Sequence, residues 1–484
     1  MILQFWQKGY LMNSTFDTIA AVSTPFGKGG IAVIRISGAD AIEICSKIFV
    51  PTSKKYPSLA SVPARYAVYG EIMSCPEGFS GAERYVLDTG LATVFSSPNS
   101  FTGEETVEIS CHGGVLVTRN VLSAFLFAGA RLAEAGEFTR RAFVNGKMGL
   151  SAAEALGSLL DAKTDEQLSV SRSGLNGTLE RRSGEIYSDF CKILSSVYAK
   201  IDYPDEDLAE MSRDEIICAV KEVKEKAQNL ADTYRTGRAI CEGVRTVICG
   251  KTNVGKSSIY NLLVGHDAAI VTDIEGTTRD ILSQDIALGK VSLRLFDTAG
   301  LRKGDEVDRV EQIGIERAER EIENAELVFA VFDGSRPTDN EDRQLAQRLK
   351  RLTSVAVINK SDLPQLVDED FISASFDFVI HLCASSPDNI AEREKLQTIV
   401  EKLFIDESIN THTDAVIVNA RQYAAVIGAV EASNNALQAL ENDFPLDACC
   451  IDIEAAMSSI GCLDGRQVEQ DIVNSIFSKF CVGK

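Results

Sequence analysis

The chain has 484 residues, a length that corresponds to about three domains of roughly 150 residues each. Apolar residues make up 45% and charged residues 25% of it, which argues against an intrinsically disordered chain. The formal net charge of −21 opposes long-range attraction to nucleic acids, so an RNA substrate would require a local basic patch or a basic partner protein.

The sequence carries no signal for secretion or membrane insertion. No run approaches the ~18 consecutive apolar residues that span a bilayer, and the segment 1–12 lacks an apolar stretch and a cleavage site. Met12 is an alternative start to Met1. The 12 cysteines show no spacing typical of disulfide frameworks or zinc sites. We therefore expect a cytoplasmic protein with reduced thiols and no membrane association.

The first part of the chain is predicted to be an α+β domain. Short β-rich runs, such as 31–36 and 85–94, are separated by Gly, Pro and Ser clusters, and 115–127 has a helical pattern. From Ser151 the pattern becomes helical, and Ser151 with Glu154 predicts a capping box.

Strands return at 244–249 and alternate with helical patterns to about residue 405, which is typical of a parallel sheet. Helical periodicity then resumes, and Val468, Ile472, Ile476 and Phe480 are predicted to form the buried face of the last helix.

The simplest interpretation is a helical domain in two segments with an α/β domain inserted between them. The predicted fold class is therefore a multidomain α/β and α protein. Its predicted parts are an N-terminal α+β domain (13–149), a helical domain (150–242 and 406–484) and an inserted P-loop domain of the Ras-like type (243–405).

A phosphate-binding loop is predicted at 250–257, where GKTNVGKS matches GxxxxGK[ST] between a predicted strand and a predicted helix. Such a loop points backbone amides at phosphates, Lys256 would reach the β and γ oxygens, and Ser257 would bind Mg²⁺. A chance glycine-rich turn is the alternative, which the flanking strand and helix disfavour.

Two further motifs follow strand ends. Asp297-Thr298-Ala299-Gly300 places a carboxylate near the metal and a glycine amide near the γ-phosphate. In Asn359-Lys360-Ser361-Asp362, the Asp362 carboxylate would accept two hydrogen bonds from guanine that adenine cannot donate. A surface loop is the alternative for either motif alone, but three motifs in this order predict GTP.

The segment 270–280 is polar and suits a switch that orders around Mg²⁺ and the γ-phosphate, with Thr278 as the second metal ligand. Leu301 follows Gly300, where Ras-like enzymes carry a water-orienting glutamine, so another group must position water.

Several motifs along the chain together resemble the tRNA modification GTPase family MnmE, also called TrmE. The resemblance implies a dimerising, folate-binding N-terminal domain, a helical domain and an inserted G domain. The motifs lie at 24–31, 34–38, 101–104, 112–114, 136–140, 142–143, 202–206, 276–280, 297–302 and 480–484.

The resemblance also implies a K⁺ site at Asn253, with oxygens from Thr272, Ile274 and Thr277. A cation there would neutralise the negative charge that develops on the phosphates during hydrolysis, which an arginine finger does in other GTPases. The alternative for Asn253 is a loop-shaping hydrogen bond. Glu311 aligns with a glutamate that orients the attacking water indirectly. Its alternative is a solvated helix charge, and the spacing from Arg302 is two residues longer than usual.

Together, the motifs and the resemblance assign nucleotide contacts to Asn253, Val254, Gly255, Lys256, Ser257, Ser258, Thr272, Asp273, Ile274, Glu275, Gly276, Thr277, Thr278, Asp297, Thr298, Ala299, Gly300, Asn359, Lys360 and Asp362. The last guanine-contacting loop has Cys383-Ala-Ser385, where the family commonly has Ser-Ala and a basic residue.

By the same resemblance, the folate contacts fall on Arg35, Glu108, Lys147 and Lys484, and Cys481 is a candidate catalytic residue. Basic side chains suit the folate glutamate, and Glu108 suits the pterin donors. The alternative for the four folate contacts is that they are ordinary surface charges, and the alternative for Cys481 is a buried helix-end thiol.

The implied reaction adds an aminomethyl-type (carboxymethylaminomethyl) group to carbon 5 of the wobble uridine in certain tRNAs. Its one-carbon unit would come from 5-formyl- or 5,10-methylene-tetrahydrofolate. The implied assembly is a homodimer that joins an FAD-containing MnmG (GidA) partner in a heterotetramer. No GxGxxG dinucleotide motif is present, consistent with FAD on the partner. The alternative is a regulatory GTPase, for example in ribosome assembly, without RNA chemistry.

Overall fold

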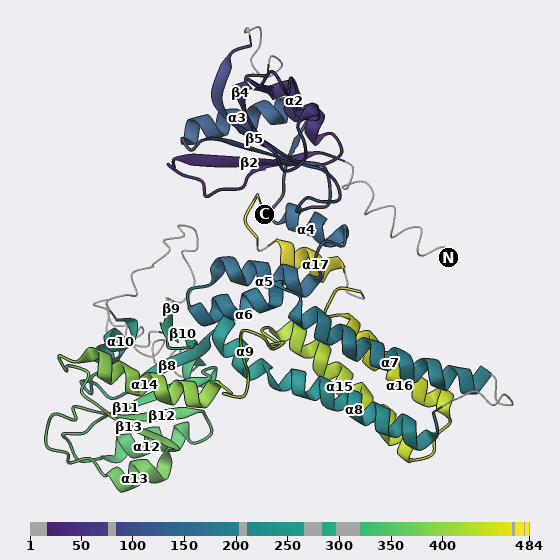
Figure 1. Ribbon diagram of the computed structural model, residues 1–484. Helices are drawn as coiled ribbons and strands as arrows, with labels where there is room; N and C mark the ends of the chain where they lie inside the picture. Colours follow the sequence, from purple (N-terminus) through teal and green to yellow (C-terminus); the bar gives the residue numbers. More distant parts are fainter. Residues whose placement is uncertain are drawn as a thin grey trace. The chain divides into compact units, whose positions relative to one another are not determined.

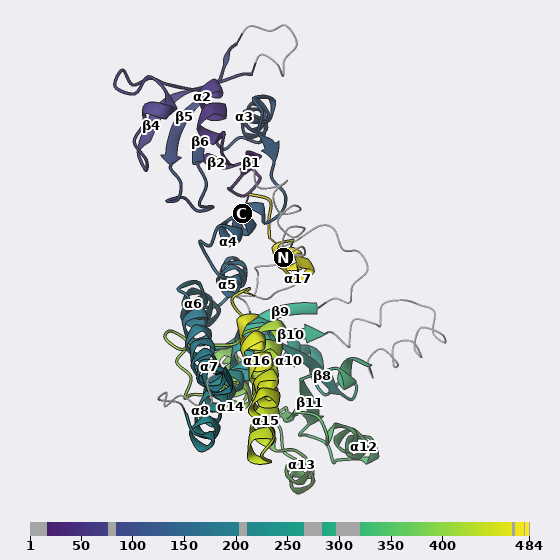
Figure 2. The same cartoon turned by 90° about the vertical axis from the view of Figure 1, so that its right-hand side faces the viewer.

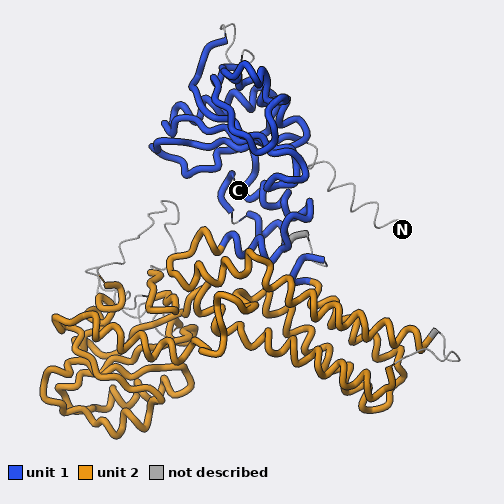
Figure 3. The backbone as a smooth tube through the Cα atoms, viewed as in Figure 1, with its two compact units in different colours: residues 1–157, 462–484 blue, residues 158–461 orange. Residues whose placement is uncertain are grey.

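The computed structural model describes residues 17–75, 84–202, 211–265, 283–296, 320–466, 470–478 and 480–483. The chain forms two compact units, one of residues 1–157 and 462–484 and the other of residues 158–461 (Figure 3). Helices and strands carry the labels of Figure 1.

A seven-stranded sheet is the centre of the first unit, with the strand order β3-β4-β5-β6-β2-β1-β7 (Figure 2). Neighbouring strands are antiparallel, except that β1 and β7 are parallel. The strands are β1 (Ile19–Val22), β2 (Ile31–Ser37), β3 (Phe49–Pro51), β4 (Ala67–Met73), β5 (Val86–Phe95), β6 (Thr106–His112) and β7 (Arg131–Leu132).

Helices α2 (Ala41–Ile48) and α3 (Val115–Phe127) pack on one face of this sheet. Alternate residues of β2, β4, β5 and β6 point into the core between sheet and helices, because side chains along a strand point to opposite faces in turn. The short helix η1 (Leu59–Ser61) closes one side of that core. The predicted α+β class is confirmed for this part of the chain.

A second, small core in this unit joins residues distant in sequence. Helices α4 (Glu137–Val144), α5 (Leu150–Asp161) and α17 (Gln470–Phe477) meet around Leu150, Ala153, Val473 and Phe477. In the tail that follows, Val482 forms an isolated antiparallel β-bridge with Ala135, outside the named strands.

One local prediction for these helices is wrong, and a second holds only in part. The Ser151 hydroxyl is buried one residue inside α5 and donates to the Leu463 carbonyl at 2.6 Å, so a tertiary contact replaces the predicted capping box. Ile472 is 39% exposed, whereas Val473 and Phe477 are buried. Ile476 and Phe480 are partly buried against the same core, as predicted, so the prediction is wrong only at Ile472; Val468 lies outside the described residues.

The second unit contains the helical domain. Its four long helices, α7 (Thr178–Asp202), α8 (Arg213–Asp232), α15 (Ala420–Glu441) and α16 (Leu446–Gly461), pack side by side (Figures 1 and 2). The shorter α6 (Asp165–Leu175) and α9 (Tyr234–Cys241) precede the α/β part. Segments on both sides of the α/β part in the sequence thus build one bundle, as predicted.

A six-stranded sheet in the order β13-β12-β11-β8-β10-β9 forms the α/β part. All neighbours are parallel except β9 and β10. The strands are β8 (Val244–Gly250), β9 (Ser283–Leu288), β10 (Val291–Phe296), β11 (Leu327–Asp333), β12 (Ser354–Asn359) and β13 (Phe378–Leu382).

Helices cover both faces of this sheet. One core contains residues of α10 (Lys256–Val264) and α14 (Asn389–Phe404), and the other contains residues of α12 (Asn340–Leu349) and α13 (Glu369–Ser375). The predicted parallel α/β class is confirmed, while the domain limits given above stay predictions. Within the described residues, no helix is long and apolar enough to cross a membrane.

Candidate functional site

The loop between β8 and α10 requires glycine at both of its ends. Gly250 has φ +146°, and a Cβ there would lie 2.4 Å from the Val331 carbonyl oxygen. Gly255 is the N-cap of α10 with φ +102°, and a Cβ there would lie 2.1 Å from Nδ2 of Asn359. Only glycine satisfies both the left-handed backbone and the close approach. The spacing of the predicted phosphate loop therefore has a steric reason.

The start of α10 is suited to anions. Ser257 and Ser258 occupy its first turn, where backbone amides lack partners within the helix and the helix dipole is positive. The Lys256 ammonium is folded back over the loop and donates to the Gly250 carbonyl at 2.9 Å and to the Lys251 carbonyl. Asn253 is exposed, with φ +63°. Val254 is buried against the core.

Asn359, the last residue of β12, ties two loops together. Its Nδ2 donates to the Val254 carbonyl at 2.8 Å, and its Oδ1 accepts from the Ala384 amide at 3.1 Å. The side chain is buried at 4% exposure. Both of its polar ends are thus engaged by backbone groups, so Asn359 aligns the phosphate loop with the segment 383–385.

Asp362 is exposed beyond β12, beside Cys383. Burial raises the pKa of the Cys383 thiol, and a hydrogen bond with the Asp362 carboxylate raises it further. The structure therefore brings the two predicted guanine-contacting loops together, with the Asp362 carboxylate at their junction. Lys360 also lies there, and its ammonium is 2.6 Å from Oδ2 of Asp333.

Lys251 is a residue of the phosphate loop to which the sequence interpretation gave no role. Its ammonium forms ion pairs with Asp339, the N-cap of α12, and with Asp342 at 3.1 Å. These contacts anchor the loop on a neighbouring helix. The spacing of about 90 residues between the partners leaves no local sequence pattern that would have indicated them.

The remaining nucleotide candidates lie outside the described residues: Thr272, Asp273, Ile274, Glu275, Gly276, Thr277, Thr278, Asp297, Thr298, Ala299, Gly300 and Glu311. The predicted second Mg²⁺ ligand, three of the four K⁺ ligands and the water-orienting glutamate are among them.

In the first unit, the predicted folate contacts Arg35 and Glu108 face each other across β2 and β6. The Arg35 Nε and Nη2 atoms each lie 2.9 Å from Oε1 of Glu108. The Arg35 guanidinium also lies over the rings of Phe101 and Phe138, at 5.2 and 5.6 Å. Cross-strand pairing and aromatic packing fix this arginine, which keeps 19% of its side chain exposed.

Two further candidates in this unit lie on irregular segments. Lys147 donates to the Pro98 carbonyl at 2.9 Å. Cys481 is exposed on the tail, which is held on both sides because Val482 pairs with Ala135 and the Ser23 hydroxyl donates to the Gly483 carbonyl at 3.0 Å. Cys481 follows α17 and is exposed, so the alternative of a buried helix-end thiol is wrong. Lys484 lies outside the described residues.

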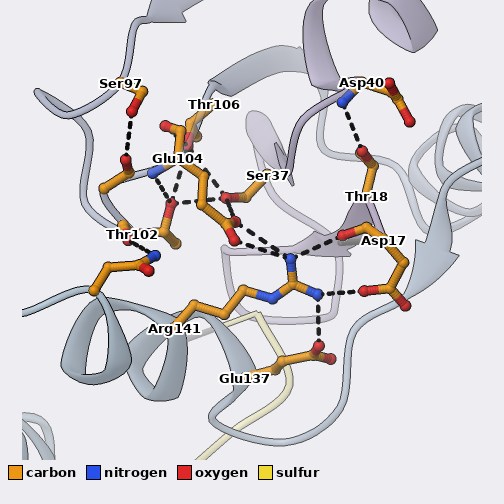
Figure 4. A network of polar contacts seen from close by, with 12 residues as sticks. Asp17, Thr18, Ser37, Asp40, Ser97, Thr102, Glu104, Thr106, Glu137 and Arg141 are labelled. Atoms are coloured by element: carbon orange, nitrogen blue, oxygen red, sulfur yellow. Dashed lines mark hydrogen bonds and ion pairs between the residues drawn. The ribbon is translucent and has the colours of Figure 1, made fainter. Parts of the chain in front are cut away.

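Arg141 is the centre of an ionic network in the first unit (Figure 4). Arg141, 3% exposed, contacts Glu137 at 2.9 Å, Asp17 at 2.7 Å and Glu104 at 3.2 Å. Glu104 in turn accepts from the Ser37 hydroxyl at 2.7 Å. The motifs 101–104 and 136–140 carried the resemblance, but their joint structural role was not evident from the sequence.

Comparison with known proteins gives matches to both the N-terminal part and the remainder of the chain. Residues 18–147 match the family model "GTP-binding protein TrmE N-terminus", and residues 150–481 match the "MnmE helical domain" model. A tRNA modification GTPase MnmE of Thermoanaerobacter sp. (strain X514) is 38% identical over 469 residues, covering 97% of this chain and 100% of the relative. That of Clostridioides difficile (strain 630) is 36% identical over 470 residues, covering 97% and 99%.

The chain belongs to the MnmE family. Among solved structures, a variant of Aquifex aeolicus Era bound to GDP.AlF4⁻ is 21% identical, with a TM-score of 0.25, and the match covers 39% of this chain and 65% of that one. That likeness is too low to carry an argument. Membership of the MnmE family rests on the two family models and on relatives aligned over nearly the whole chain.

Proposed function

We propose that this MnmE-family chain is a K⁺-activated GTPase that acts in the modification of wobble uridines in tRNA. The observation that carries the proposal is the convergence of the loop 250–257, Asn359 and Asp362 at one edge of the parallel sheet. Nucleotides bind at the carboxyl edge of such sheets, where loops and helix N-termini meet.

The described residues fit a guanine nucleotide. Glycines 250 and 255 allow the loop backbone to pass close to Val331 and Asn359, and the first turn of α10 presents amides to phosphate. Lys256 would exchange its two carbonyl contacts for phosphate oxygens, a stronger, charge-assisted interaction. The Asp362 carboxylate would accept two hydrogen bonds from guanine. It would disfavour ATP, because adenine cannot donate these hydrogen bonds and the carboxylate would stay unpaired.

We further propose that Mg²⁺ is held by Ser257 and Thr278, and K⁺ by Asn253 with oxygens of Thr272, Ile274 and Thr277. Together these cations would supply the positive charge that phosphoryl transfer requires. Asn253 is exposed, which makes its side chain accessible to a cation. Glu311 would position the attacking water.

In the N-terminal unit we propose a folate site. The Glu108 carboxylate would accept from the pterin donors, and Arg35 on the adjacent strand would hold that carboxylate in place. Lys147 and Lys484 would add positive charge, and Cys481 would be presented beside them by the tail. The folate would supply the one-carbon unit as the 5-formyl or 5,10-methylene form.

The proposed assembly is a cytoplasmic homodimer that joins an FAD-carrying MnmG (GidA) partner. With its net charge of −21, this chain benefits from a partner that supplies the basic surface for tRNA. A purely regulatory GTPase would use the same nucleotide loops. The Arg35–Glu108 arrangement and the anchored tail favour the modification role, since neither serves nucleotide binding.

The nucleotide assignment is tested with Asp362→Asn. The variant should lose GTP affinity and gain affinity for xanthosine triphosphate, because the amide donates where xanthine has a carbonyl. Calorimetry of both nucleotides with the full-length chain provides the measurement, and unchanged GTP affinity would contradict the assignment. The biological role is tested by mass spectrometry of wobble nucleosides from cells that lack this protein, in which the modified uridine should disappear.

A further inference from the structure

The central strand β11 ends in a buried carboxylate that no motif above includes. Asp333 is 8% exposed, and β11 lies between β8, which leads to the phosphate loop, and β12, which leads to the guanine loop. Its Oδ2 is 2.6 Å from the Lys360 ammonium, and its Oδ1 accepts from the Ser335 amide at 3.1 Å and hydroxyl at 2.6 Å. Burial would raise the pKa of Asp333, but these hydrogen bonds lower it below its usual value. The group is therefore a carboxylate at neutral pH.

The turn that follows Asp333 also holds the backbone of the guanine loop. The Gly334 amide donates to the Asn359 carbonyl at 2.9 Å, and the Leu366 amide donates to the Gly334 carbonyl at 2.7 Å. A Cβ on Gly334 would lie 2.1 Å from Oε1 of Gln365. The turn and the loop thus fit closely, one against the other.

Lys360 itself has φ +63°, a conformation that residues other than glycine adopt at a cost and that needs support from its surroundings. Its long side chain has several rotatable bonds, and the ion pair with Asp333 fixes the position of its ammonium. Both the backbone and the side chain of Lys360 are therefore restrained by the end of β11.

We propose that Asp333 is a positioning residue for guanine nucleotides: it holds Lys360, and with it the loop 359–362, in the conformation that receives the base. This inference rests on the proposed GTP site. Without the carboxylate, Lys360 would sample several rotamers, and binding would have to order it again. Asp333 contacts the loop and not the edge of the base. Its loss should therefore weaken the binding of guanine and hypoxanthine nucleotides by the same factor.

The test uses the full-length chain with GDP and inosine diphosphate as probes, measured by calorimetry. Asp333→Asn should raise the Kd of both about tenfold and leave their ratio unchanged. Lys360→Gln should have a similar effect, and the double variant should be no weaker than either single one. The matched control is Arg336→Gln, because Arg336 approaches Asp333 at 3.4 Å from the solvent side with 66% of its side chain exposed. Its Kd values should stay within about twofold of wild type.

The outcomes separate this inference from the proposed function. Failure of the wild-type chain to bind GDP would refute the GTP site itself. Wild-type binding together with normal affinity in Asp333→Asn, an additive double variant, or a changed ratio of the two nucleotides would overturn the positioning role. If Asp333→Asn shows no cooperative thermal unfolding and therefore does not fold, Ser335→Ala replaces it. That variant removes one donor to Asp333 and should raise both Kd values about threefold, so unchanged affinity there would also overturn the proposal.

Discussion

Replacement of Arg141 by methionine should destabilise the N-terminal unit by about 3 kcal/mol, at the lower end of the range for breaking a buried ion pair. Arg141 is 3% exposed and Glu137 1% exposed, so a charge that loses its partner in this pair is not hydrated by solvent in its place. The cost stays at the lower end because Glu137 and Asp17 each keep Arg131 at 2.6 Å. Glu104 loses its ion pair with Arg141 and keeps the Ser37 hydroxyl. Methionine is of similar length, so little cavity forms.

Hydrogen–deuterium exchange of the full-length chain measures this change locally, which suits a protein of several domains. Peptides from 17–37 and 131–145 should exchange about a hundredfold faster in Arg141→Met, since each 1.4 kcal/mol corresponds to about tenfold. Arg140→Met is the matched control, because Arg140 is partly exposed on the same helix and forms no ion pair with a described residue. It should change exchange less than about fivefold. Equal exchange in the two variants would refute the network as a source of stability.

The ionic network, the cation site and the tail each allow a further test. Burial would raise the pKa of Glu137, but its bonds with Arg131, the Glu134 amide and Arg141 lower the pKa below its usual value of 4.5. The ionised Glu137 therefore contributes its full stabilisation of the folded state above pH 4.5. That stabilisation is lost as the pH falls from 4.5 through the lowered pKa of the folded state. In wild type, the peptides 17–37 and 131–145 should lose protection from exchange as the pH falls below 4.5. In Glu137→Gln, the protection of these peptides should depend less on pH. Replacement of K⁺ by Na⁺ at constant ionic strength should lower kcat for GTP, and Asn253→Ala should remove the difference; equal turnover of wild type in both salts would exclude the cation. Cys481→Ser should abolish wobble-uridine modification and preserve GTP hydrolysis, with an unchanged thermal midpoint; normal modification would exclude a catalytic thiol.

Local spacing in the sequence was sufficient to predict much of this protein. The run 250–257 follows β8 and begins α10 as expected, because a glycine-bounded loop between a strand and a helix is a short-range pattern. The same holds for β2, β5 and α3, whose bounds agree closely with the segments predicted at 31–36, 85–94 and 115–127. The two-segment helical bundle followed from periodicity on either side of the strand-rich part.

The contacts that give these elements their role were decided only by the tertiary structure. Asn359 joins Val254 to Ala384, Asp333 holds Lys360, and Arg141 gathers Asp17 and Glu104. The capping box predicted at Ser151 and the buried position predicted for Ile472 failed for the same reason. A hydroxyl or carboxylate has the same local preferences wherever it occurs, and its partner is set by which distant segments the folded core brings within about 3 Å of it.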